Sequence, residues 1–233
     1  MNAVITGASR GIGKAVAEIF ATHGYNLFLC SRNENNLLET VEELKTLYPG
    51  ITIQAQAFDL GKKQEAILFG EWITNNVSTI DVLINNVGSY LPGNISDEPD
   101  GALEQMLEVN LYSAYHTTRA VLPRMIKEKS GHIFTICSIA SLSAYPNGGA
   151  YSISKYALLG FTKNLRQELK PHYIKVTAVI PGAVYTDSWK GSGVPESRIM
   201  EAEDIATMIY TTSRLSPQAT VEEIVIRPQL GDL

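Results

Sequence analysis

The sequence predicts a doubly wound α/β fold built on one mostly parallel sheet of seven strands. Seven short apolar runs rich in β-branched residues are typical of buried strands, and stretches with helical spacing of apolar residues separate them. Parallel neighbours require a crossover, so this alternation favours helices on both faces of the sheet. At 233 residues, 45% of them hydrophobic, the chain suits one domain spanning residues 1–233.

The strands are expected, in chain order, at residues 3–7, 26–32, 51–59, 80–87, 132–138, 174–182 and 222–228. The first helix is predicted from Ile12, Val16, Ile19 and Phe20, which recur at helical spacing. The other helices are expected at residues 33–48, 62–75, 100–129, 150–170 and 201–213. Residues 186–200 contain two glycines and a proline, and they predict a short substrate loop over a ligand crevice.

Composition and charge exclude several classes of function. A net charge of -5 argues against nucleic-acid and anionic-membrane partners, because both need clustered Lys and Arg. No apolar run approaches membrane-spanning length, and the opening MNAVITGAS leaves no room for a leader, so we expect a cytoplasmic protein. Cys30 and Cys137 each end an apolar run and are expected as buried free thiols. The histidines show no paired spacing, so we expect no metal.

A glycine-rich turn, TGASRGIG at residues 6–13, follows the first strand and opens the first helix. In that setting glycines let the backbone approach a pyrophosphate at the positive end of the helix. A kinase-type phosphate loop is excluded, because it would need glycine at position 8 and Ser or Thr at position 15, and both are alanine. The spacing of Gly7, Gly11 and Gly13 therefore predicts a dinucleotide-binding turn.

Tyr151 and Lys155 lie four residues apart in the stretch YSISK, within a predicted helix. Residues at this spacing share one helix face, so both side chains can reach the same pocket. A nearby ammonium favours the phenolate and lowers the pKa of a tyrosine from about 10, which makes proton exchange efficient near neutral pH. Of the eleven tyrosines, only Tyr151 has a lysine four residues later.

The glycine turn, the stretch NNVG at residues 85–88 and the YSISK stretch together resemble the motifs of the short-chain dehydrogenase/reductase family, whose fold is Rossmann-type. The resemblance runs from residue 3 to about residue 228. Val87 stands where the family has alanine, which affects only local packing. The resemblance implies an NAD(P)-dependent oxidoreductase that acts on CH-OH and C=O groups.

By the same resemblance, Asn110, Ser138, Tyr151 and Lys155 form the catalytic group. Tyr151 would donate a proton to the developing alkoxide while Ser138 hydrogen-bonds that oxygen. Lys155 would lower the pKa of Tyr151 and grip the nicotinamide ribose, and Asn110 would help hold a water that links Lys155 to solvent. Ser141 and Ser143 lie past the expected end of the fifth strand, so we interpret them as pocket-shaping or capping residues.

The end of the second strand favours NADP(H) over NAD(H). Arg32 and Ser31 stand where NAD-binding folds place an acid, and Arg10 can add a second cation beside a 2′-phosphate. The alternative is that Glu34 reads the ribose, which leaves NAD(H) possible. Asp59 matches the family's adenine-binding position but can equally cap a turn.

The family pattern also assigns Val184 and Thr186 to the nicotinamide carboxamide. The full set of expected cofactor-binding residues is Gly7, Ser9, Arg10, Gly11, Ile12, Gly13, Ser31, Arg32, Asp59, Leu60, Asn86, Gly88, Tyr151, Lys155, Pro181, Gly182, Val184 and Thr186.

The simplest function is NADPH-dependent reduction of a small-molecule ketone or aldehyde, with a 3-oxoacyl thioester as one candidate. The alternative is a non-catalytic NADP(H)-binding or sensing protein on the same fold, whose usual mark is a lost Ser, Tyr or Lys. A sugar-nucleotide epimerase would need a larger C-terminal substrate domain. Apolar stripes that include Leu158, Leu159 and Phe161 resemble the family's subunit contact, and they imply a homodimer or homotetramer.

Overall fold

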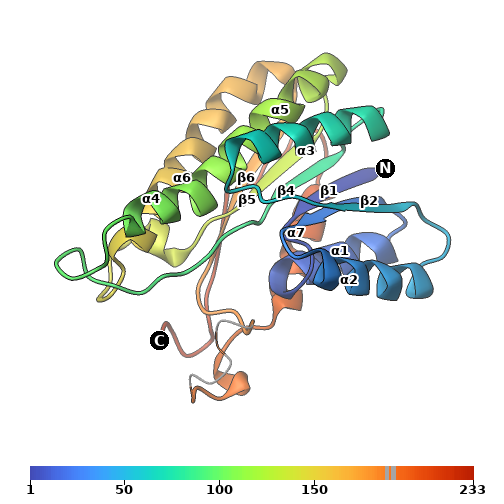
Figure 1. Cartoon of the computed structure of the whole chain (residues 1–233). Coiled ribbons are helices and arrows are strands. Elements are labelled where there is room, and N and C mark those ends of the chain that lie inside the picture. The colour runs from blue at the N-terminus through green and yellow to red at the C-terminus, as the bar shows by residue number, and fades with distance from the viewer. Residues whose placement is uncertain (187–188, 190–192) are drawn as a thin grey trace.

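A computed structural model of the chain describes residues 1–186, 189 and 193–233, and within them seven strands form one parallel sheet. The strands are β1 (Asn2–Thr6), β2 (Asn26–Ser31), β3 (Ile53–Ala57), β4 (Val82–Asn85), β5 (His132–Ile136), β6 (Lys175–Pro181) and β7 (Glu223–Ile226). Their order in the sheet is β3-β2-β1-β4-β5-β6-β7 (Figure 1). The predicted doubly wound parallel sheet is confirmed.

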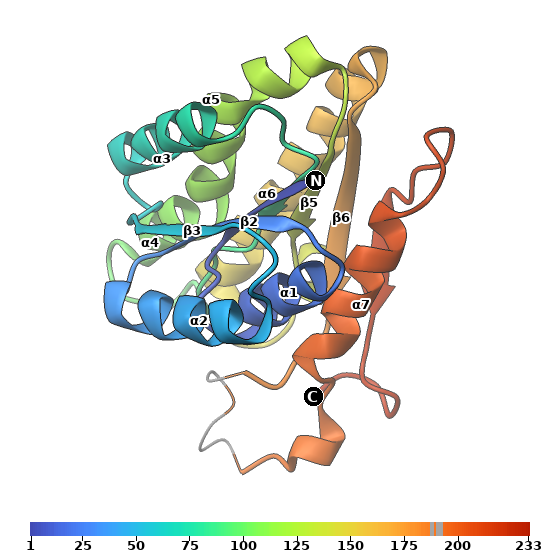
Figure 2. The ribbon, with the colours of Figure 1, turned by 90° about the vertical axis from the view of Figure 1, so that its right-hand side faces the viewer.

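Helices cover both faces of the sheet (Figures 1 and 2). On one face lie α1 (Gly11–Thr22), α2 (Glu34–Leu47) and α7 (Ala202–Ser213), and on the other lie α3 (Lys63–Asn76), α5 (Ser113–Glu128) and α6 (Gly149–Leu169). The short helix α4 (Ala102–Leu107) packs against α6. None of the helices in the described part of the chain is long and apolar enough to cross a membrane.

The central strands are apolar along their whole length because each face of the sheet is covered. In β1, Val4 packs toward the layer of α3 and α5, while its neighbour Ile5 packs toward the layer of α1 and α7. The same alternation places Leu83 and Ile84 of β4 on opposite faces.

The strand order reverses at β1, which pairs with β2 on one side and β4 on the other. The connections that leave these strands therefore diverge, and a crevice opens at their carboxyl ends, where ligands bind in doubly wound folds. The glycine turn follows β1 directly, and residues 86–88 follow β4 at the same edge.

The predicted helix at residues 100–129 is wrong in one respect: it is interrupted. After α4 comes a π-helical turn, Glu108–Tyr112, before α5 begins. A π-turn inserts one residue into the helix and changes the direction of the side chains around it. Asn110 lies in this turn and is fully buried.

Two further local expectations need correction. Ser138 does not end a strand, because β5 stops at Ile136 and Ser138 caps the 3₁₀ turn Ile139–Ser141. Leu158 and Leu159 are buried within the protein's own core, so they do not belong to an outward-facing stripe on α6.

The predicted substrate loop at 186–200 lies partly outside the described residues, since positions 187–188 and 190–192 are not among them. Its described end forms a 3₁₀ turn at Glu196–Arg198, and Met200 bridges back to Val184. Another 3₁₀ turn, Lys170–His172, follows α6.

Candidate active site

The glycine turn is tight and is anchored to the residue after β4. Gly7 and Gly11 have φ angles of 65° and 53°, which glycine adopts without strain. A β-carbon on Gly13 would lie 2.2 Å from the carbonyl oxygen of Gly7, so only glycine fits there. The side-chain nitrogen of Asn86 donates to the carbonyl oxygens of Thr6 and Gly7, at 3.0 and 3.1 Å. Asn86 therefore has a structural role in holding the turn.

The amino-terminal end of α1 suits a pyrophosphate group. Its first turn carries no acidic residue, and no side chain caps its first N–H groups. The side chain of Ile12 packs against the core, which anchors the first turn of α1. The glycine cradle and the positive helix end thus fit the dinucleotide that the sequence predicts.

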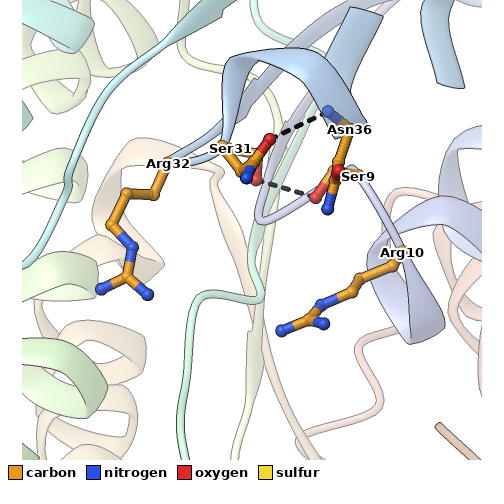
Figure 3. A pocket seen from close by; sticks show the side chains of 6 residues that line it. Ser9, Arg10, Ser31, Arg32 and Asn36 are labelled. Atoms are coloured by element: carbon orange, nitrogen blue, oxygen red, sulfur yellow. Dashed lines mark hydrogen bonds between the residues drawn. The ribbon is translucent and has the colours of Figure 1, made fainter. Parts of the chain in front are cut away.

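A cavity of about 320 Å³ adjoins this helix end (Figure 3). Its lining residues are Ser9, Arg10, Ser31, Arg32, Asn33 and Asn36. The hydroxyl oxygens of Ser9 and Ser31 are 2.8 Å apart, which joins the glycine turn to the end of β2. Figure 3 shows the two arginine side chains extending beside this serine pair. Four of the predicted cofactor residues therefore meet in one cavity that carries two cations.

Two of the lining residues were not predicted from the sequence. Asn33 caps α2, since its side-chain oxygen accepts a hydrogen bond from the backbone N–H of Asn36 at 3.0 Å. An asparagine before a helical pattern is a common N-cap, and this signal could have identified Asn33. Glu34, the alternative ribose-reading residue, is not among the lining residues.

Asp59 and Leu60 follow β3 at the same edge of the sheet. The Asp59 carboxylate accepts a hydrogen bond from the backbone N–H of Gly61 at 3.3 Å and lies 3.7 Å from the Lys62 ammonium. The alternative capping role of Asp59 is thus observed. Leu60 is buried in the core beneath the turn.

The segment after β6 lies against the glycine turn. A β-carbon on Gly11 would approach the Thr186 methyl group to 3.1 Å. Pro181 ends β6, Gly182 follows it, and Val184 is buried beside Met200. The structure therefore brings the predicted nicotinamide segment and the predicted pyrophosphate turn together, although 175 residues separate Gly11 from Thr186 along the chain.

Ser138, Tyr151 and Lys155 gather beyond the carboxyl end of β5. The Lys155 ammonium donates to the carbonyl oxygen of Ile136 at 3.0 Å and lies 5.9 Å from the centre of the Tyr151 ring. The Ser138 hydroxyl accepts from the backbone N–H of Ala140 and interacts with the Tyr151 hydroxyl. The capping role expected of Ser141 is confirmed, because its hydroxyl accepts the Ser138 N–H at 3.2 Å.

The expected lowering of the Tyr151 pKa is wrong for this structure. Burial raises the pKa of Tyr151, which outweighs the lowering effect of the hydrogen bond with Ser138, and Cys137 raises it further. Burial also lowers the pKa of Lys155 to about 8, because the residue is only 4% exposed. The phenol therefore keeps its proton at neutral pH, which suits a proton donor.

Asn110 connects three parts of the site. Its side-chain oxygen accepts from the backbone N–H of Ser89 at 2.8 Å, and its nitrogen donates to the Ser89 carbonyl at 3.1 Å and the Ser154 hydroxyl at 2.9 Å. A β-carbon on Gly88 would lie 3.2 Å from the Asn110 oxygen and 3.3 Å from the Lys155 nitrogen. The side chains of Asn110 and Lys155 therefore both lie against Gly88.

Ser154 was missed by the sequence analysis. Its hydroxyl donates to the carbonyl oxygen of Tyr151 at 2.7 Å while it accepts from Asn110. Ser154 could have been identified from the sequence, because it lies about one helical turn after Tyr151 within YSISK. Ser154 thus joins the π-turn to α6 at the site.

The two cysteines are free and buried, as predicted. Burial raises the pKa of Cys30 to about 12 and that of Cys137 to about 11, so neither forms a thiolate readily. Among the described residues, no group of three or more His, Cys, Asp or Glu side chains is placed to hold a metal ion.

Known proteins resemble the chain over almost its whole length. The sequence model of the short chain dehydrogenase family matches residues 1–196. An uncharacterised oxidoreductase of Staphylococcus epidermidis is 30% identical over 230 residues, which are 97% of this chain and 96% of the relative.

Two solved structures share the fold. An alcohol dehydrogenase from the archaeon Thermococcus sibiricus, complexed with 5-hydroxy-NADP, has a TM-score of 0.91 at 27% identity and covers 100% of this chain and 98% of its own. A metagenomic short-chain oxidoreductase in complex with NADP has a TM-score of 0.85 at 29% identity, and the match covers 98% of this chain and 97% of that one. With the dinucleotide cradle and the Ser-Tyr-Lys cluster, these matches show that the chain belongs to the short-chain dehydrogenase family and is an NAD(P)-dependent oxidoreductase.

Proposed function

We propose that the protein is an NADPH-dependent carbonyl reductase that converts a ketone or aldehyde to an alcohol. The proposal rests on how close the glycine turn lies to the Ser-Tyr-Lys cluster. Asn86 holds the glycine turn, and Gly88, two residues later, abuts the Lys155 ammonium in the Ser-Tyr-Lys cluster. A dinucleotide on the glycine turn would therefore extend toward the side chains that handle the substrate oxygen.

The chain's own residues orient the substrate and supply the proton. NADPH, when bound, supplies the hydride that is added to the carbonyl carbon. Tyr151 donates its phenolic proton to the oxygen, and it is protonated for this task because burial raises its pKa. The Ser138 hydroxyl accepts from the Ala140 N–H, so its own proton is available to the same substrate oxygen.

Lys155 stabilises the phenolate that remains after proton transfer. At a pKa of about 8 the side chain is mostly protonated at neutral pH, and its charge lies on the Tyr151 side of the site. By family resemblance it would also bind the nicotinamide ribose. Asn110 would hold the Ser89 backbone and, through Ser154, the first turn of α6.

The replacement Tyr151→Phe tests this assignment. It removes the proton while keeping the ring, so turnover of NADPH with a panel of ketones should fall to background, whereas NADPH affinity should stay within about twofold of wild type. Near-normal turnover by the variant would refute the role of Tyr151. A wild-type protein that binds NADPH but oxidises it with no ketone or aldehyde would favour the non-catalytic alternative.

We also propose that NADP(H) is preferred, with Arg10 and Arg32 beside the 2′-phosphate and NAD(H) as the weaker cofactor. Two cations and two hydroxyls line the cavity of Figure 3, and both structural relatives named above bind an NADP form. Hydrogen bonds to a charged group contribute about 1.5–3 kcal/mol, so Arg32→Ala should weaken NADPH binding by about tenfold or more.

The matched control is Glu34→Ala, which changes the neighbouring charge. Calorimetric titration of both variants with NADPH and NADH separates the two interpretations. If Glu34 instead binds the ribose, Glu34→Ala will weaken NADH binding, and Arg32→Ala will leave the ratio of NADPH affinity to NADH affinity unchanged.

A homodimer or homotetramer remains part of the proposal, with a changed contact surface. Since Leu158 and Leu159 face inward, the exposed apolar residues here are Tyr112 on the π-turn and Ile153 and Tyr156 on α6. Light scattering coupled to size exclusion will give the mass, and Tyr156→Glu should shift it toward the monomer if this surface is the contact.

A further inference from the structure

An aromatic side chain outside the predicted catalytic group covers the proton donor. Tyr90, in the segment after β4, meets the Tyr151 ring edge-to-face, with ring centres 4.9 Å apart and an angle of 84° between the planes. Tyr90 is nevertheless 49% exposed. One part of its ring therefore contacts Tyr151, and the rest is exposed to solvent.

A third phenol joins this pair from another segment. Tyr145, in the connection between β5 and α6, is 39% exposed, and its phenol lies near those of Tyr90 and Tyr151. Burial and these two neighbouring phenols raise the pKa of Tyr145, which keeps it neutral. We call Tyr90 and Tyr145 the phenol wall.

The two segments that carry the phenol wall are bonded to each other. The backbone N–H of Gly93 donates to the carbonyl oxygen of Asn147 at 3.1 Å, and the Asn147 N–H donates to the Asn94 side chain at 3.2 Å. The two loops that carry the phenol wall are therefore joined to each other next to Tyr151.

The Tyr151 ring also borders an apolar cluster, whereas the Lys155 ammonium lies 5.9 Å from the ring centre. The ring packs with Leu91, Leu103, Met106 and Ala150 in this small cluster. The nearby carboxylate of Glu98 is engaged at the start of α6, where it accepts the Ala150 N–H at 3.1 Å. The phenol wall and this apolar cluster thus offer flat aromatic and aliphatic surfaces beside the Tyr151 ring.

We propose that the phenol wall receives the larger substituent of the carbonyl compound, and that the preferred substrates are uncharged ketones or aldehydes carrying an aryl or similarly flat apolar group. In this assignment Tyr90 determines specificity. The inference rests on the proposed reductase function. It disfavours acyl thioesters of anionic carriers, because the described side chains of the phenol wall and of the apolar cluster carry no cation for their phosphates.

Steady-state NADPH oxidation with acetophenone, butan-2-one and acetoacetyl-coenzyme A tests the proposal. Wild-type protein should prefer acetophenone. Aromatic contacts of this kind correspond to up to about a tenfold change in affinity, so Tyr90→Leu should lose about tenfold in kcat/KM for acetophenone, mainly through KM, and less than twofold for butan-2-one. Tyr90→Phe keeps the ring and should behave like wild type.

The matched control is Tyr173→Leu, since Tyr173 is 75% exposed and lies after α6 at the opposite edge of the sheet. An equal loss for both ketones in Tyr90→Leu would show a general structural role and overturn the proposal, as would a wild-type preference for the thioester.

A binding measurement separates failure of this inference from failure of the reductase function. Calorimetric titration with 1-phenylethanol in the presence of NADP⁺ requires no turnover. Weaker binding by Tyr90→Leu than by wild type supports the wall even if no ketone is reduced, and equal binding by the two proteins refutes it.

Discussion

Replacing Lys155 by methionine should stabilise the protein while it removes the cation from the candidate active site. Lys155 is only 4% exposed, and its ammonium has one hydrogen bond to a carbonyl oxygen in the structure. Burial without an anionic partner disfavours the charged form, and this is the largest cause of its lowered pKa. Methionine fills a similar volume without the charge.

The magnitude follows from the pKa. A lowering from 10.5 to about 8 corresponds to a penalty of about 3 kcal/mol at pH 7, at 1.36 kcal/mol for each pH unit. Loss of the hydrogen bond to Ile136 offsets about 1 kcal/mol of the gain. The free energy of unfolding should therefore rise by about 2 kcal/mol, or roughly 4–8 °C in Tm for a chain of this size.

The pH dependence has a defined sign. Between pH 8 and pH 10.5 the native lysine is neutral while the unfolded lysine still holds its proton. The unfolded state then binds more protons, so the stability of the wild type rises with pH across this window relative to the variant. By pH 9.5 the difference in free energy of unfolding between the variant and the wild type should be about 2 kcal/mol smaller than at pH 7.

Thermal and urea unfolding of both proteins at pH 7 and pH 9.5, without added NADP(H), measures this difference. Lys62→Met is the control, because Lys62 lies on the surface and its ion partners raise its pKa above this window. A Lys155→Met variant that is less stable than wild type at pH 7, or whose advantage persists at pH 9.5, would refute the reasoning.

Three further changes have expected outcomes. Gly13→Ala should abolish NADPH binding in a fluorescence titration, since the added β-carbon would lie 2.2 Å from a carbonyl oxygen of the glycine turn, whereas Gly50→Ala, with open space around it, should bind normally. Gly70→Ala should lower the free energy of unfolding by about 1–3 kcal/mol, because its β-carbon would lie 2.2 Å from one on α5; unchanged urea unfolding would contradict this packing. Ser154→Ala should cost about 1 kcal/mol of stability and lower kcat severalfold through loss of its bond to Asn110, and an unchanged kcat would argue against that connection.

Much of the fold was predictable because its signals are local. The apolar runs and their separating helices reflect a sheet covered on both faces, and TGASRGIG combines glycine spacing with a strand before it and a helix after it. The π-turn was not predictable in this way. Residues 100–129 have a helical pattern throughout, and the interruption at Asn110 is accompanied by bonds to Ser89 and Ser154, which are distant in sequence.

The sequence by itself determined the sheet, the dinucleotide turn and the pairing of Tyr151 with Lys155 on one helix face, because each depends on residues close together in the chain. Only the tertiary structure decided the protonation of that pair, and it reversed the expected direction for Tyr151. It also decided that Tyr90 covers the phenol. The physical reason is that desolvation and ring contacts depend on what other segments pack nearby, which spacing along one helix does not specify.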